Sequence, residues 1–174
     1  MSIYKDKLAA SEAAFIGADY AGGPDTTVVR KAGTSMGKTD IGGMKFDDGK
    51  PDYTLVPWDI VGYGAVEAQL MMPLYRWWRG SLSASECTIQ VIEAYSAMAM
   101  DFVELLSQSL NYGATKYEAW NWEKGISRRR LYAAACRHFK GVYDHGLPAR
   151  DKESGLPHTA HLAFYAVAIH KATD

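Results

Sequence analysis

The sequence has few cysteines, no long apolar run and almost no net charge. Its two cysteines, Cys87 and Cys136, cannot form a disulfide framework, which fits a reducing compartment. The longest apolar runs, at 133–136 and 162–169, fall well short of the roughly 20 residues that cross a bilayer. Residues 1–10 lack the apolar stretch of a secretory signal. We therefore expect a cytoplasmic protein without a membrane partner.

The charge balance excludes a general nucleic-acid binder. Lys and Arg number 19 and Asp and Glu number 20, which leaves a formal charge of −1. A protein with this balance has no basic field to hold a duplex. We expect no duplex partner, and any recognition of phosphate must be local.

The composition is typical of a folded domain, with 48% hydrophobic and 22% charged residues in 174. Residues 17–50 differ, because they are rich in Gly, Thr, Asp and Lys. We therefore expect residues 1–43 to form a partly irregular, Gly-rich N-terminal arm and residues 44–174 to form the folded domain. Residues 33–39 end like a phosphate loop, but the spacing of Gly33 and Gly37 is one residue too short for one.

The sequence of residues 44–174 predicts an all-α helical bundle, because apolar residues recur at helical spacing and no alternating strand pattern stands out. Pro57 opens a first helical segment that Pro73 should kink or end. A long helix is expected from Ser83 or Ser85 to near Gly113. Further helices are expected from residue 127 to about 146, and from residue 158 to the C-terminus.

Histidines and carboxylates gather in the last third of the chain. His158 and His161 are three residues apart on one expected helix face, so both side chains can meet one metal ion or substrate. Asp151 and Glu153 lie just upstream, and His138 lies on an Ala-rich helix. Imidazoles favour zinc and other transition metals, whereas carboxylates favour magnesium or manganese. The alternative is a His158 that caps its helix and a His161 that packs in the core.

A second cluster, at 111–125, is aromatic and basic. Lys116 lies among Tyr117, Trp120 and Trp122, an arrangement that suits the phosphates and the base of a nucleotide, although a Trp-rich packing corner would look the same. Three weaker patterns also fit an ordinary protein surface. The lysines of 45–50 fit a solvated turn, and the arginines of 128–130 fit a solvated surface. Asp101 with Glu104 fits either a metal pair or surface charge.

Together these clusters resemble a known family. The motifs are Lys-Phe-Asp-Asp-Gly-Lys-Pro at 45–51, Tyr-Gly-Ala-Thr-Lys-Tyr at 112–117 with Asn121-Trp122 and Lys124-Gly125, Arg137-His138, and Asp-Lys-Glu-Ser-Gly-Leu-Pro-His at 151–158 with His161. They resemble the N-terminal domain of the phage dATP/dGTP diphosphohydrolases, which can precede a MazG-like all-α pyrophosphohydrolase domain. The resemblance implies a phage protein that acts in the cytoplasm of the infected bacterium and handles purine nucleotides.

The resemblance and the clusters together give the candidate residues. We expect catalytic roles for Glu153, His138 and His158. A divalent metal, Mg²⁺ or Mn²⁺ with Zn²⁺ as an alternative, would be held by residues from the set His138, Asp151, Glu153, His158 and His161. Substrate contacts are expected from seven residues: Lys45, Lys50, Lys116, Tyr117, Asn121, Trp122 and Arg137.

Two departures from the family pattern stand out. MazG-type enzymes hold magnesium with Glu-x-x-Glu and Glu-x-x-Asp pairs, whereas the last helix here offers His158-x-x-His161. In an enzyme, the metal site is therefore either built differently or completed from four carboxylates: Asp101, Glu104, Asp151 and Glu153. Residues 61–100 form an inserted helical segment with clustered large apolar side chains. We expect this segment to mediate a homo-oligomer, with packing onto its own bundle as the alternative. The clustered side chains are Met71, Met72, Leu74, Trp77 and Trp78.

Two classes of function therefore compete. The first is a metal-dependent enzyme that converts a purine (deoxy)nucleoside triphosphate to the monophosphate and pyrophosphate. The second is a non-catalytic module that binds or sequesters a nucleotide or nucleotide signal, or that docks onto a host protein. Only the enzyme needs a tight metal site, and release of pyrophosphate from a panel of dNTPs and NTPs with magnesium or manganese discriminates between the two.

Overall fold

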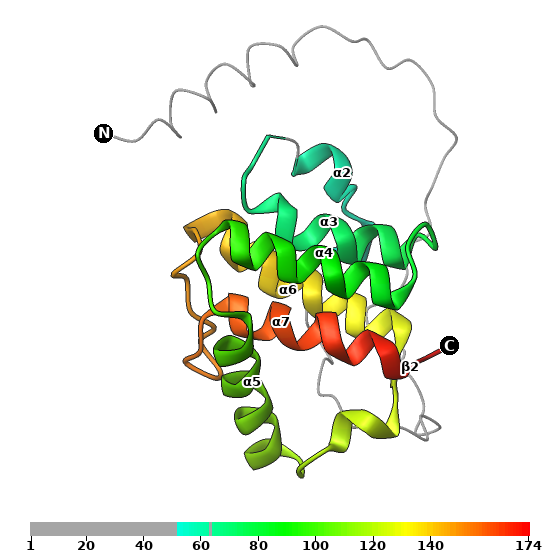
Figure 1. Cartoon of the computed structure of the whole chain (residues 1–174), viewed down its shortest axis with the longest axis vertical. Coiled ribbons are helices and arrows are strands. Elements are labelled where there is room, and N and C mark those ends of the chain that lie inside the picture. The colour runs from blue at the N-terminus through cyan, green and yellow to red at the C-terminus, as the bar shows by residue number, and fades with distance from the viewer. Residues whose placement is uncertain (1–51, 63) are drawn as a thin grey trace, which may run out of the picture. The chain divides into compact units, whose positions relative to one another are not determined.

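The computed structural model describes residues 52–62 and 64–174. The expected arm of residues 1–43, with Lys45 and Lys50, lies outside the described residues. The described part is an all-α bundle, as predicted (Figure 1). Its elements are η1 (Tyr53–Leu55), α2 (Trp58–Val61), α3 (Ala68–Trp78), α4 (Ala84–Ala97), α5 (Phe102–Lys116), η2 (Asn121–Lys124), β1 (Ile126–Ser127), α6 (Arg128–His145), α7 (His158–Ala168), η3 (Ile169–Lys171) and β2 (Ala172–Thr173).

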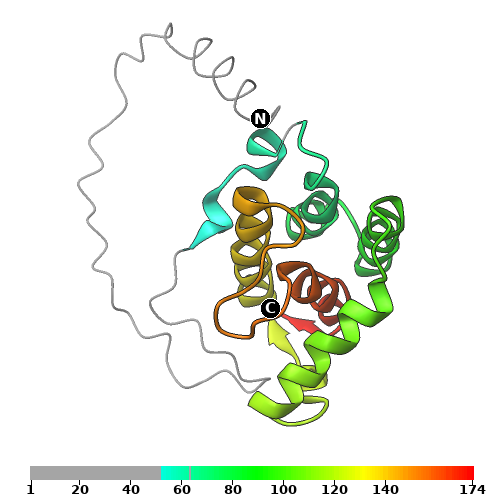
Figure 2. The same ribbon diagram turned by 90° about the vertical axis from the view of Figure 1, so that its left-hand side faces the viewer.

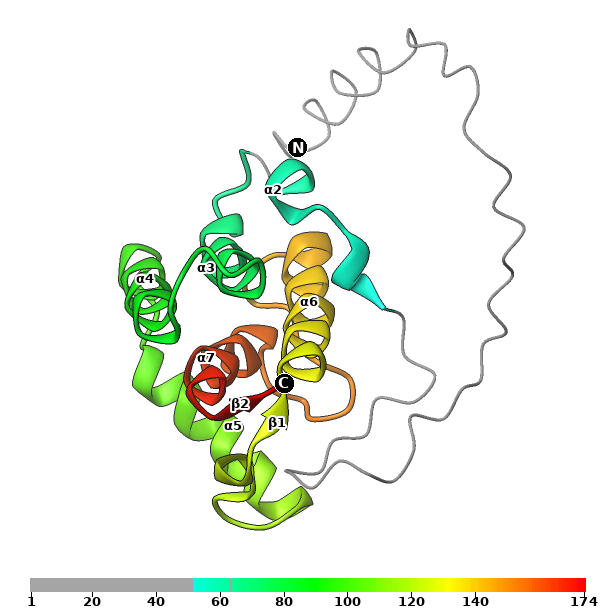
Figure 3. The same ribbon diagram turned by 90° about the vertical axis from the view of Figure 1, so that its right-hand side faces the viewer.

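Helix α7 lies at the centre of the bundle. It packs against α5 and α6, and α4 also contacts it (Figure 3). Helix α3 packs against both α4 and α6. The sequence of α7 is apolar nearly all the way round, which is typical of a helix enclosed by neighbours. Its start is as expected, because Pro157 precedes the first turn and α7 begins at His158. The expectation that it runs to the C-terminus is wrong, because the helix ends at Ala168 and η3 and β2 follow. The short parallel strands β1 and β2 tie the start of α6 to the C-terminus.

The prediction of one long helix between residues 83 and 113 is wrong, because this stretch forms two helices, α4 and α5. Ala99 adopts a left-handed conformation with φ 54°. Asp101 then caps α5 by accepting a hydrogen bond from the Glu104 backbone N–H at 3.0 Å. The apolar periodicity continues across the break, so it concealed the change of direction. Asp101 and Glu104 therefore begin a helix, and neither belongs to the group of three possible metal ligands found among the described residues.

The segment 61–100 builds α3 and α4 and contributes to the core. Met71, Leu74 and Trp77 are buried in this chain's own bundle. Trp78 stacks on Tyr132 with ring centroids 5.0 Å apart. The burial of these side chains fits the alternative of packing onto their own bundle, and the homo-oligomer stays a prediction. Helix α3 also continues through Pro73, so of the two outcomes expected for this proline, a kink or an end, the end does not occur.

At the start of α6, Arg128 contacts α3, so the expected solvated surface does not describe this residue of the 128–130 run. Ser127 caps the helix as expected, accepting from the Arg130 backbone N–H at 3.3 Å. Arg128 lies over the Trp77 ring, 4.7 Å from its centroid, and donates to the carbonyls of Trp77 and Trp78. Arg129 pairs with Asp52 at 3.0 Å. Arg128 therefore fastens α6 to the C-terminal end of α3.

No helix in the described part of the chain has both the length and the apolarity to span a membrane.

Candidate functional site

A pocket of about 700 Å³ opens between α5, α6, α7 and the segments that connect them. This volume is in the range of small-molecule sites. All the predicted site residues that the structure describes line it: Lys116, Tyr117, Asn121, Trp122, Arg137, His138, Asp151, Glu153, His158 and His161. The sequence reasoning missed several further lining residues, among them Ser109, Phe164 and Tyr165. Tyr165 follows His161 by one helical turn, a spacing that could have indicated it.

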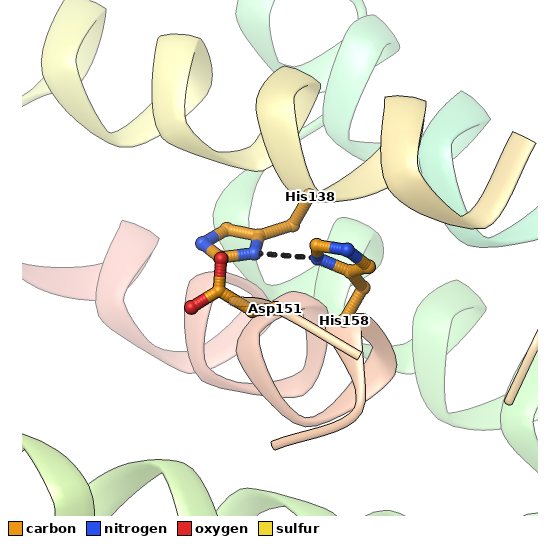
Figure 4. Close-up of side chains that lie close together, drawn as sticks. All are labelled: His138, Asp151 and His158. Carbon is orange, nitrogen blue, oxygen red and sulfur yellow. Dashed lines mark hydrogen bonds between the residues drawn. The ribbon is translucent and has the colours of Figure 1, made fainter. Parts of the chain in front are cut away.

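Three of the five predicted metal ligands form one group. The ligand atoms of His138, Asp151 and His158 all lie within 4.8 Å of one another (Figure 4). The Nδ1 atoms of the two imidazoles are 3.0 Å apart. Ligands on opposite sides of one cation at about 2.1–2.3 Å are about 4.2–4.6 Å apart, so the group has the dimensions of a metal site.

The loop between α6 and α7 places Asp151 beside the imidazoles. Figure 2 shows this loop running back along α6 before α7 begins. The His158 backbone N–H donates to the Ala149 carbonyl at 2.9 Å and closes the loop. Within it, the backbone N–H and the hydroxyl of Ser154 both donate to Asp151 Oδ2, at 2.9 and 3.0 Å. These bonds fix the carboxylate, so a local turn in the sequence creates the third ligand position.

A glycine on α6 makes room for His158. The imidazole lies directly where a Cβ on Gly141 would be, and its Nε2, Cδ2 and Cε1 atoms would all collide with that Cβ. Glycine in a helix costs about 1 kcal/mol relative to alanine. Here the missing side chain lets His158 pack against the α6 backbone.

The electrostatics favour the ligating forms of this group. Burial lowers the pKa of the His158 imidazole; the Asp151 carboxylate opposes this shift and His145 adds to it. Burial alone would raise the pKa of Asp151, but the hydrogen bonds from Ser154 and the nearby imidazoles lower it overall. At neutral pH His158 is therefore neutral and Asp151 ionised, which are the states that bind a metal.

His161 lies next to the group with its nitrogens near hydroxyls. Its Nε2 is 2.8 Å from the Ser154 hydroxyl and its Nδ1 is 3.4 Å from that of Ser109. Its ring stacks on His138, with centroids 4.2 Å apart and planes at 18°. His161 is 7% exposed. The residue therefore joins the Asp151 loop to His138, and its burial beside two hydroxyl groups also fits the alternative of a His161 that packs in the core.

Lys116 and Glu153 form an ion pair at the side of the pocket. Lys116 ends α5, and its ammonium lies 5.9 Å from the Tyr112 ring centroid and 5.6 Å from that of Tyr117. Partial burial would lower the pKa of Lys116, but the hydrogen bond and the charge of Glu153 raise it overall. Lys116 therefore stays cationic, as recognition of phosphate requires.

Aromatic side chains make up much of the remaining wall. Trp122 and Phe164 line the pocket and also pack against the core. Trp120 is 67% exposed. The two readings of the aromatic cluster are therefore not exclusive, because the same corner of the bundle both packs and lines the pocket.

The fold and the site define an all-α domain whose pocket combines a candidate metal centre, a lysine and aromatic rings. Residues 90–174 match the model of the family described as dATP/dGTP diphosphohydrolase, N-terminal. The resemblance seen in the motifs is thus confirmed. The match starts within α4 and includes every residue that lines the pocket. No curated protein and no solved structure gives a match.

Proposed function

We propose that this chain is a metal-dependent diphosphohydrolase of purine (deoxy)nucleoside triphosphates, which releases the nucleoside monophosphate and pyrophosphate. The observation that carries the proposal is the His138–Asp151–His158 group, which lies in one pocket with Lys116 and aromatic side chains. The family description supports a nucleotide substrate. A phage origin and action in the cytoplasm of the infected bacterium are part of the same proposal.

His138, Asp151 and His158 would hold the divalent cation. Two imidazole nitrogens with one carboxylate suit Mn²⁺ or Zn²⁺ better than Mg²⁺, which prefers oxygen ligands. When bound, such a cation neutralises phosphate charge and makes water more acidic. His161, with both nitrogens near hydroxyls, would position His138 and the Asp151 loop and would not bind the metal directly.

The remaining polar residues of the pocket have separate tasks. Lys116 and Arg137 would bind the triphosphate and offset the charge that grows in the transition state, with Lys45 and Lys50 as further candidates. Glu153 would accept a proton from the attacking water. The water oxygen bonds to the α-phosphorus, the bond from that phosphorus to the bridging oxygen breaks, and pyrophosphate leaves with that oxygen.

A direct assay tests this function. Purified protein is incubated with each dNTP and NTP and with Mg²⁺, Mn²⁺ or Zn²⁺, and pyrophosphate and monophosphate are measured. We expect equal amounts of the two products from dATP and dGTP, and none with chelator. Nucleotide binding without turnover under every metal would contradict the enzyme and would support a nucleotide-binding or sequestering module.

Lys116→Ala is expected to weaken nucleotide binding about tenfold at low salt and less at high salt, because the lost contact is between charges. Trp122→Ala should weaken binding by an amount that depends little on salt, because stacking contributes about 1–3 kcal/mol without a charge. Titration of a nucleotide analogue at two ionic strengths measures both. Equal affinity of wild type and Lys116→Ala at low salt would refute the phosphate role.

A further inference from the structure

Asn121 presents an unusual polar group in the pocket wall. The residue is 8% exposed, begins η2 and lines the pocket. Its backbone N–H donates to the Glu118 carbonyl at 3.3 Å. Throughout residues 52–62 and 64–174, its carboxamide has no hydrogen-bond partner. The carboxamide is not among the enclosed, unpartnered side-chain atoms of the described residues, so its polar atoms keep contact with solvent at the pocket wall. The carboxamide is therefore available to a ligand.

The backbone around Asn121 is held in place at some cost. Trp120, directly before it, has φ 63°, a left-handed conformation that is rare for a bulky residue. Gly125, at the end of η2, has φ 85°, and a Cβ there would collide with Thr173 on β2. The β1–β2 pair lies directly after this glycine. Strain of this kind persists where the surrounding structure enforces it, which is frequent at ligand sites.

The surroundings of Asn121 suit a nucleobase. Trp122, Phe164 and Tyr165 line the same pocket and supply flat apolar surface. The metal group and Lys116 supply the charges that phosphates need. A nucleotide with its phosphates at those charged groups has its base left for the aromatic part of the wall, where a polar group that can read the base edge determines specificity.

We propose that the carboxamide of Asn121 hydrogen-bonds to the Watson–Crick edge of a purine base; this inference rests on the function proposed above. Adenine presents the acceptor N1 and the N6 amino donor, and guanine presents the acceptor O6 and the donor N1–H. A carboxamide has both an acceptor and a donor, so it pairs with either base after a half-turn about its terminal torsion. A carboxylate only accepts, so it pairs with N1–H and the N2 amino group of guanine and not with N1 of adenine.

Asn121→Asp is therefore expected to change base preference. Equilibrium binding of the non-hydrolysable α,β-imido analogues of dATP and dGTP is measured at pH 7.5 for wild type and variant. We expect wild type to bind both analogues. In Asn121→Asp the ratio of the two dissociation constants should move toward guanine by at least about tenfold, since one good pair of base contacts is worth about 1–3 kcal/mol. Asn121→Leu should weaken both analogues.

The ratio separates this role from a structural one. Added negative charge repels both triphosphates equally, and partial misfolding lowers both affinities together. Gln108→Glu on α5 makes the same amide-to-carboxylate change at a residue bonded to Glu104, outside the pocket lining, and should leave the ratio unchanged. An unchanged ratio in a folded Asn121→Asp would overturn the inference. Failure of wild type to bind either analogue would overturn the proposed function instead.

Discussion

Asp151→Asn and His158→Ala are each expected to lower metal-dependent turnover by about 100-fold or more. In Asp151→Asn the side-chain oxygen can still accept the two hydrogen bonds from Ser154, so the loop keeps its shape. The variant nevertheless loses the anionic oxygen next to the two imidazoles. His158→Ala removes one nitrogen of the pair that is 3.0 Å apart. Calorimetric titration with Mn²⁺ and the pyrophosphate assay measure the two effects.

The matched control is Asp144→Asn. Asp144 is exposed on the last turn of α6 and pairs with Lys140, so it undergoes the same chemical change away from the pocket. Its Mn²⁺ affinity and turnover should equal those of wild type. Wild-type Mn²⁺ affinity in both Asp151→Asn and His158→Ala would show that the His138–Asp151–His158 group does not hold the metal.

Gly141→Ala is expected to lower Mn²⁺ affinity at least about tenfold, although glycine at this position supplies no ligand. The added methyl group would occupy the place of the His158 imidazole, so the ring must leave the group. Supporting residues around metal ligands typically affect affinity about 10–100-fold. Helix propensity acts the other way, since alanine favours a helix by about 1 kcal/mol over glycine. Loss of metal binding without unfolding is the expected signature, measured by calorimetry and urea denaturation.

Gly113→Ala on α5 separates sterics from propensity. A Cβ at Gly113 meets nothing within 4 Å, so this variant gains only the helix propensity. It should bind Mn²⁺ like wild type and unfold at slightly higher urea. If Gly141→Ala also bound Mn²⁺ like wild type, His158 would not need its position against α6 in order to bind the metal.

The residue types and spacings identified much of the site. His158 and Asp151 stand in one continuous motif, so a turn between them can bring both side chains to one place. Lys116, Asn121 and Trp122 follow one another within a short stretch, so local geometry also brings them to one wall. The helix starts at Ser127 and after Pro157 were equally predictable, because capping residues and prolines act within one turn.

The expectations that failed or stayed open are those for which a local sequence pattern fits two different structures. Apolar spacing continues across Ala99 and cannot reveal a left-handed turn, so two helices look like one. The large apolar side chains of 61–100 fit packing on a second copy or on their own bundle; the structure buries Met71, Leu74 and Trp77 in their own bundle, and the homo-oligomer stays a prediction. The spacing of His158 and His161 on one helix face also could not indicate which of the two imidazoles would bind a metal.

The sequence alone determined the helical class, the starts of α6 and α7 and many of the residues that line the pocket, because these depend on periodicity, capping and short-range motifs. Tertiary structure alone decided which of them meet. His138 on α6 approaches His158 on α7 only because Gly141 leaves space between the helices. His161 lies between the hydroxyls of Ser109 and Ser154, which come from two other elements. Such contacts depend on the relative placement of packed helices, and no local interaction in the sequence encodes that placement.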